Sequence, residues 1–90
     1  MPQKLDDESI RRELATVPTW QRAGDEIRRS VSLPSFRAAL AFVAYVGELA
    51  EAANHHPDID LRYNRVDLAL TTHSAGGLTT NDFELARHIG

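Results

Sequence analysis

The chain has 90 residues, of which 42% are hydrophobic and 26% charged, and its 13 acidic and 10 basic side chains give a formal net charge of −3. This size allows one small domain, and the absence of a basic stripe argues against direct nucleic-acid binding. The longest apolar run, residues 38–46, is too short to cross a membrane, and the N-terminus lacks the apolar core of a secretory signal. Cysteine is absent, so no disulfide or thiolate metal site can form. We therefore expect a single cytoplasmic domain that spans residues 1–90.

A short helix is predicted to begin after Asp6, which is a favourable N-cap residue. Leu5 and Ile10 then have the spacing of a hydrophobic staple, in which apolar side chains on either side of the cap pack together. Pro18 marks the end of this segment. We expect the helix to dock at the edge of a sheet.

A first β-hairpin is predicted over residues 20–33, with turn-forming residues at 23–25. Its second strand places apolar side chains at alternate positions on one face, and Arg29 interrupts that face.

The central helix is predicted to run from about Phe36 to Ala53, after Ser35 as N-cap. Apolar residues repeat every three or four positions along two stripes of this helix. One stripe consists of Phe36, Leu40, Val43, Val46 or Gly47, and Ala50, and the other of Phe42, Tyr45 and Leu49. A helix that is apolar on two sides indicates a covered second face, either by another helix of the same subunit or by self-association. We expect a homo-oligomer, a dimer or a tetramer.

A second hairpin is predicted after Pro57, because apolar and polar residues alternate on both sides of Asn64-Arg65. With Asn64-Arg65 as the loop, Leu61 would face Leu68, and continuing that register would place His56 opposite His73. Directly opposed residues have β-carbons about 5 Å apart, so both imidazoles could address one small molecule. A bulge near Pro57 would shift the pairing and could bring His55 forward instead.

A third helix is predicted from about Thr80 to Ile89. Thr79 is its expected N-cap, Asp82 holds the reciprocal position of a capping box, and Leu78 and Phe83 have the spacing of a staple. The element order is therefore α-β-β-α-β-β-α. This order predicts an α+β fold, a four-stranded antiparallel sheet with three helices on one face.

Three of the four histidines, His55, His56 and His73, fall within 19 positions. Histidine exchanges protons near neutral pH, so this grouping indicates acid–base catalysis. Spacing alone leaves two alternatives open, a purely structural role and a metal site with Asp82 or Glu51 as a third ligand. Glu51 stands one helical turn before His55 and could orient an imidazole or simply be solvated. For Asp82 we favour the capping role over contact with a substrate.

The residues Glu51, His55-His56-Pro57, Tyr63, His73 and Asp82, in this order and spacing, resemble the pattern of the pterin-4a-carbinolamine dehydratase family. The phrase Thr-Thr-His-Ser-Ala-Gly-Gly-Leu at 71–78 is also similar to that family, and the resemblance covers nearly the whole chain. Ile59 and Leu33 depart from it, because many members have an aromatic residue at these positions.

The resemblance implies a hydro-lyase that dehydrates 4a-hydroxytetrahydropterin to quinonoid dihydropterin in tetrahydrobiopterin recycling, without a metal or organic cofactor. It implies His55 and His73 as the acid–base pair, with the choice of acid open, and His56 as the residue that binds and orients the pterin. Glu51, Pro57 and Asp82 would support them. The same resemblance allows two other roles, a dimerisation or coactivator-type binding module and a pterin-handling protein of molybdenum-cofactor metabolism.

Overall fold

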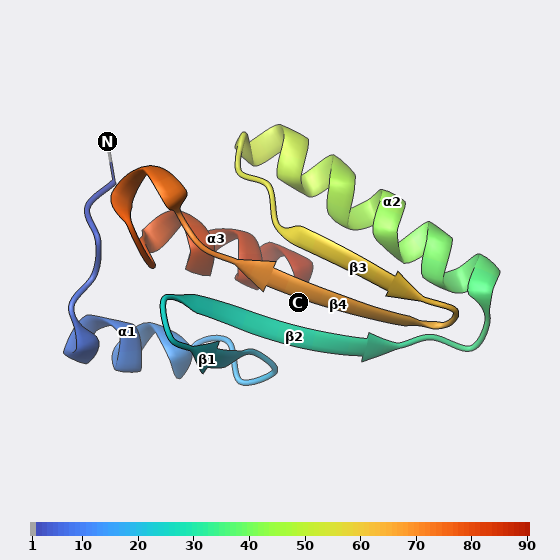
Figure 1. The fold of residues 1–90 in the computed structure, drawn as a ribbon, viewed down its shortest axis with the longest axis horizontal. Helices are drawn as coiled ribbons and strands as arrows, with labels where there is room; N and C mark the ends of the chain where they lie inside the picture. The colour runs from blue at the N-terminus through green and yellow to red at the C-terminus, as the bar shows by residue number, and fades with distance from the viewer. Residues whose placement is uncertain (1) are drawn as a thin grey trace.

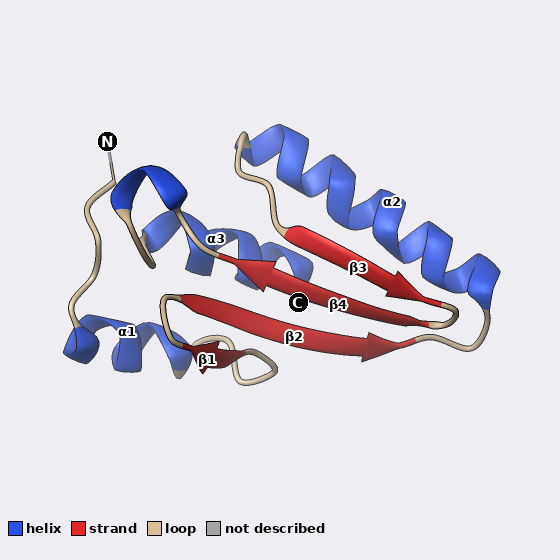
Figure 2. Cartoon of the chain, in the orientation of Figure 1, coloured by secondary structure: helices blue, strands red, loops and turns tan. Residues whose placement is uncertain are grey.

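The computed structural model describes residues 2–90, which form three α-helices and one four-stranded antiparallel sheet (Figure 1; Figure 2). The sheet order is β1-β2-β4-β3, which confirms the predicted order of elements and fold class. The elements are α1 (Asp7–Leu14), β1 (Gln21–Ala23), β2 (Glu26–Ser32), α2 (Phe36–Ala53), β3 (Asp58–Arg62), β4 (Arg65–Leu70), the short 3₁₀ helix η1 (His73–Ala75) and α3 (Thr80–Ile89).

One hydrophobic core lies between the sheet and the helices. The alternation in β4 buries Val66, Leu68 and Leu70 on the inner face and leaves Arg65 exposed on the other. Every helix contributes to the same cluster of buried side chains, which includes Ile10 of α1, Val46 of α2, Ile27 of β2 and Phe83 of α3. The three helices therefore cover one face of the sheet, and the opposite face carries mostly polar side chains.

The first helix begins as the sequence predicts. The Asp6 carboxylate accepts a hydrogen bond from the backbone N–H of Ser9 at 2.8 Å. This backbone bond, with a smaller contribution from the Ser9 hydroxyl, holds the pKa of Asp6 below its ordinary value of 3.8. An ion pair of 3.0 Å between Asp7 and Arg22 of β1 ties the helix to the edge of the sheet.

The central helix has the predicted bounds, and Ser35 caps it by accepting a hydrogen bond from the N–H of Ala38 at 3.1 Å. Its two apolar stripes are divided differently from the prediction. Residues from both stripes reach the core, and Val46 is fully buried. Phe36, Leu40 and Tyr45 nevertheless remain 46%, 47% and 49% exposed.

The predicted register of the second hairpin is wrong. Leu61 faces Val66 rather than Leu68, because the turn consists of Tyr63 and Asn64 rather than Asn64 and Arg65. The difference of two residues leaves every side chain on the same face, so the hydrophobic alternation cannot distinguish the two registers.

Contacts of the turn decide the register instead. Tyr63 adopts a left-handed φ of 52° and its ring stacks on Phe36, with centroids 6.3 Å apart. Asn64 exchanges hydrogen bonds with Leu33, through its backbone oxygen at 2.8 Å and its side-chain amide at 3.0 Å. The strand pairing ends at Asp58, so His56 does not pair with His73.

The last helix confirms the predicted capping box. The side chain of Thr79 caps the first turn, and the Asp82 carboxylate accepts a hydrogen bond from the backbone N–H of Thr79. The staple residues Leu78 and Phe83 are 1% and 0% exposed. The helix start is thereby fixed in position next to the end of β4.

Candidate active site

The three histidines converge although the register that predicted their meeting is wrong. His55 and His56 follow Asn54, whose left-handed backbone (φ 50°) ends α2 and turns the chain toward the sheet. His73 opens the 3₁₀ turn that follows β4. All three border one hollow of about 290 Å³, close to the lower end for small-molecule sites. Its lining residues are Asn54, His55, His56, Thr71, Thr72, His73 and Ser74.

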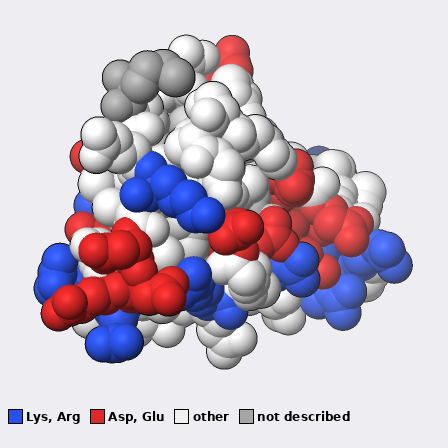
Figure 3. Space-filling model, turned by 60° about the vertical axis from the view of Figure 1, so that its left-hand side comes forward, with Lys and Arg blue, Asp and Glu red and all other residues white. Residues whose placement is uncertain are grey.

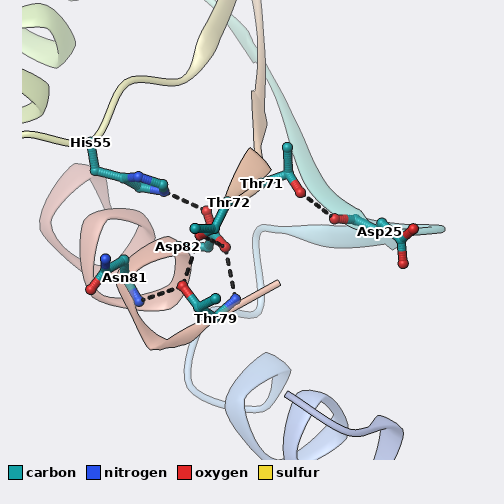
Figure 4. A network of polar contacts seen from close by, with 7 residues as sticks. All are labelled: Asp25, His55, Thr71, Thr72, Thr79, Asn81 and Asp82. Carbon is teal, nitrogen blue, oxygen red and sulfur yellow. Dashed lines mark hydrogen bonds and ion pairs between the residues drawn. The ribbon is translucent and has the colours of Figure 1, made fainter. Parts of the chain in front are cut away.

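His55 is anchored at one ring nitrogen. Its Nε2 lies 2.5 Å from Oδ1 of Asp82, which is completely buried, and the His55 side chain is only 13% exposed (Figure 4). An ionised carboxylate can only accept hydrogen bonds, so Nε2 must carry the proton. Nδ1 is then the nitrogen of His55 that remains available to a ligand.

Asp82 serves the helix and the histidine at once. Its Oδ2 accepts hydrogen bonds from the Thr79 backbone N–H at 2.9 Å and from the Thr72 hydroxyl at 2.8 Å, while Oδ1 contacts His55 (Figure 4). The predicted capping role is therefore correct, and it does not exclude the second role. The capping bond fixes the carboxylate in the orientation that the imidazole needs.

His56 and His73 are held less firmly. His56 Nε2 lies 2.5 Å from Oε2 of Glu51, and these two side chains are 57% and 75% exposed, so this pair contributes about 0–1 kcal/mol to stability. His73 is exposed, and its imidazole forms no hydrogen bond with another side chain of residues 2–90. Pro57 is half-buried and does not line the hollow.

A second hollow of about 330 Å³ lies between the end of α2 and α3. His55 borders both hollows. The other residues of the second hollow are Leu49, Ala52, Ala53, Asn81, Glu84, Leu85 and His88. This hollow contains one histidine besides His55, whereas the first brings three together.

The metal alternative finds no support in residues 2–90, where no group of three or more His, Asp or Glu side chains is arranged to hold a metal ion.

On the face in Figure 3, acidic and basic side chains are interspersed, without a continuous basic stripe. No helix in the described part of the chain has the length and apolarity needed to span a membrane.

Sequence reasoning missed the threonines around the histidines. Thr72 is 5% exposed and hydrogen-bonded to Asp82, and Thr71 lines the hollow, with its hydroxyl donating to the backbone oxygen of Asp25 at 2.6 Å. The position of Thr72 directly before His73 was the one available signal. A single threonine gives no periodicity or motif from which such a contact could be inferred.

The sequence is similar to those of known proteins over nearly its whole length. The family model described as pterin 4 alpha carbinolamine dehydratase matches residues 3–90. A Roseiflexus protein (strain RS-1) is 54% identical over 89 residues, which cover 99% of this chain and 96% of that protein. A Chloroflexus aurantiacus protein is 57% identical over 86 residues, covering 96% of this chain and 92% of that protein. Both carry the name of the dehydratase provisionally.

The fold is also similar to those of solved structures. The crystal structure of a transcriptional coactivator/pterin dehydratase from Brucella melitensis has a TM-score of 0.92 at 34% identity, covering 97% of this chain and 95% of that one. A pterin dehydratase-like protein identified as a RuBisCO assembly factor in the alpha-carboxysome shares the fold, with a TM-score of 0.63 at 18% identity and coverage of 78% and 81%. The fold of this small α+β domain is thus shared with both of these structures. This chain belongs to the pterin-4a-carbinolamine dehydratase family.

Proposed function

We propose that this protein is a hydro-lyase that converts 4a-hydroxytetrahydropterin into quinonoid dihydropterin and water, in the recycling of tetrahydrobiopterin. The observation that carries the proposal is the convergence of His55, His56 and His73 on one hollow, with His55 anchored by a buried carboxylate. Family membership supplies the class of substrate. The proposed reaction requires no metal or organic cofactor.

The reaction needs one proton donor and one proton acceptor. The C4a–O bond breaks and the oxygen leaves as water, with a proton taken from an imidazolium. The N5–H proton passes to a neutral imidazole, and its bonding electrons form the N5=C4a double bond. Two histidines that border one small hollow can perform both transfers, and general acid–base assistance of this kind contributes about 10²–10⁴-fold to a rate.

We assign the two transfers to His55 and His73. The hydrogen bond to Asp82 keeps Nε2 of His55 protonated as a donor. Nδ1 is therefore the atom that gives or takes the proton of the reaction. His73 carries no competing side-chain hydrogen bond within residues 2–90 and is accessible from the hollow. His56, paired with Glu51 at the rim, is proposed to bind and orient the ring. Pro57, which sits between His56 and β3, fixes the start of the strand rather than contacting the substrate.

The experiment is the rate of loss of 4a-hydroxytetrahydropterin, followed by stopped-flow absorbance with the spontaneous rate subtracted. Wild-type protein should accelerate the loss, and His55→Ala and His73→Ala should each lower kcat by about 100-fold or more. His88→Ala is the matched control, because His88 lies on the second hollow. If wild-type protein adds nothing to the spontaneous rate, the proposed function is wrong.

We further propose that the protein is a homo-oligomer. Phe36 and Leu40 of α2, with Tyr63 stacked on Phe36, form an exposed apolar surface that a second copy could cover. Sedimentation should show a mass above 10.0 kDa for the wild type and a shift toward the monomer for Leu40→Glu. Gln3→Glu adds the same charge at another exposed position and should leave the mass unchanged.

The same surface favours a second candidate function, a binding module for another protein. The Brucella melitensis relative is described as a transcriptional coactivator as well as a pterin dehydratase. Binding that persists in His55→Ala and His73→Ala but is lost in Leu40→Glu would separate this role from catalysis.

A further inference from the structure

Thr72 contacts the carboxylate that holds His55 and belongs to the turn that carries His73, the two histidines that we assign to proton transfer. It directly precedes His73 in the chain and is 5% exposed. Its hydroxyl oxygen lies 2.8 Å from Oδ2 of Asp82 and 2.8 Å from the hydroxyl oxygen of Thr79 (Figure 4). The carboxylate that it contacts is the one that holds His55.

The directions of these hydrogen bonds follow from the number of protons. An ionised Asp82 can only accept, so the single hydroxyl proton of Thr72 points to Oδ2. The Thr79 hydroxyl must then donate to Thr72, and its own oxygen accepts the backbone N–H of Asn81 at 3.2 Å. The Thr79 hydroxyl thus donates to the Thr72 hydroxyl, which in turn donates to the Asp82 carboxylate. Such aligned bonds in a buried site reinforce one another.

The backbone of Thr72 holds the other histidine. Its N–H donates to the Gly77 oxygen at 3.1 Å, and its oxygen accepts from the N–H groups of Gly77 at 3.3 Å and Ala75 at 3.0 Å. These bonds close the turn that begins at His73. One residue therefore fixes the turn that carries His73 through its backbone and the carboxylate that orients His55 through its side chain.

We propose that Thr72 is a positioning residue, whose hydroxyl locks the Asp82 carboxylate against His55 and so maintains the arrangement of His55 relative to His73. The kinetic consequence rests on the proposed function. The structural consequence does not, because the His55–Asp82 hydrogen bond can be observed without any substrate.

The test compares Thr72→Val, which removes the hydroxyl but keeps the branched shape and the backbone bonds, with Thr72→Ser, which keeps the hydroxyl. Thr80→Val makes the same chemical change at an exposed position of the same helix start and is the control. NMR measures the exchange of the His55 Nε2 proton with water in each variant. Stopped-flow kinetics measures kcat and KM.

In the wild type, the Nε2 proton of His55 should exchange slowly and be visible. In Thr72→Val its exchange should accelerate by about tenfold or more, and kcat should fall by about tenfold while KM changes less than about threefold. Thr72→Ser and Thr80→Val should retain wild-type exchange and kcat within about twofold. Unchanged exchange in folded Thr72→Val, or equal losses in Thr72→Val and Thr72→Ser, would overturn the proposal.

Thermal unfolding of each variant is measured first. If Thr72→Val does not fold, Thr72→Ser still decides the question, since the proposal requires a slowly exchanging Nε2 proton there and a loss of it would refute the role of the hydroxyl. If wild-type protein shows no dehydratase activity, the proposed function fails, and the exchange measurements alone then test the role of Thr72.

Discussion

Replacement of Asp82 by asparagine separates the orientation of His55 from the stability of the helix start. The new side chain would keep one carbonyl oxygen, which can still accept the hydrogen bonds from Thr72 and Thr79 that Oδ2 accepts now. Its amide NH₂ would then face His55 in place of Oδ1. Nε2 of His55 would have to become the acceptor, so that its proton moves to Nδ1, the nitrogen that we assign to catalysis.

The expected magnitudes differ for stability and activity. Loss of the charge from the hydrogen bonds should lower the free energy of unfolding by about 1–3 kcal/mol, because bonds to charged groups contribute about 1.5–3 kcal/mol and neutral ones about 1 kcal/mol. In a domain of this size, each kcal/mol lowers Tm by roughly 4–8 °C. The effect on kcat should be about 100-fold or more, since the wrong tautomer removes general acid–base assistance.

Thermal unfolding and stopped-flow dehydration of the two proteins provide the assay. Asp82→Ala serves as the comparison, because it removes the carboxylate of the capping box and leaves the buried donors unpaired, at a cost of about 3–5 kcal/mol. Asp82→Asn should therefore be folded but nearly inactive, and Asp82→Ala should be both unstable and inactive. A folded Asp82→Asn variant with kcat within about twofold of the wild type would refute the assignment of Asp82 as the residue that orients His55.

Three further predictions concern the fold. Phe83→Ala removes a fully buried ring from the core and should lower the free energy of unfolding by about 3–5 kcal/mol in chemical denaturation, whereas a loss below about 1 kcal/mol would mean that the core does not centre there. Ser35→Ala removes the N-cap of α2 and should cost about 1 kcal/mol in the same measurement; no change would show that the cap is not formed in solution. For Asp6, the folded-state pKa lies below the unfolded value of 3.8, so its stabilising contribution is present above that pH and is lost as the pH falls through the lower folded-state pKa. Denaturation as a function of pH should therefore show Asp6→Asn less stable than the wild type at about pH 6 and equal to it at about pH 2, and a difference that persists at the lower pH would contradict this.

The starts of the helices were predictable because capping chemistry is local. Asp6, Ser35 and Thr79 each satisfy backbone N–H groups within three residues, so the sequence around each cap contains the whole interaction. The alternation in β4 likewise identified the buried face of the sheet. Fold class and element order follow from these local signals.

The register of the second hairpin was not predictable in the same way. Both registers bury the same side chains, and the choice depends on contacts of Tyr63 with Phe36 and of Asn64 with Leu33, about thirty residues earlier in the chain. The histidines meet for a different reason from the predicted one, since the left-handed Asn54 and the 3₁₀ turn at His73 bring them to one hollow. Long-range contacts of single residues leave no pattern in a sequence.

The central claim is that His55, His56 and His73 border the site that takes the pterin ring. The most direct measurement is an NMR titration of the four imidazoles with a tetrahydropterin that lacks the 4a-hydroxyl group and therefore cannot react. Resonances of His55, His56 and His73 should shift with a common dissociation constant, while those of His88 stay unchanged. Shifts confined to His88, or no shift of His56 and His73 at saturation, would contradict the account.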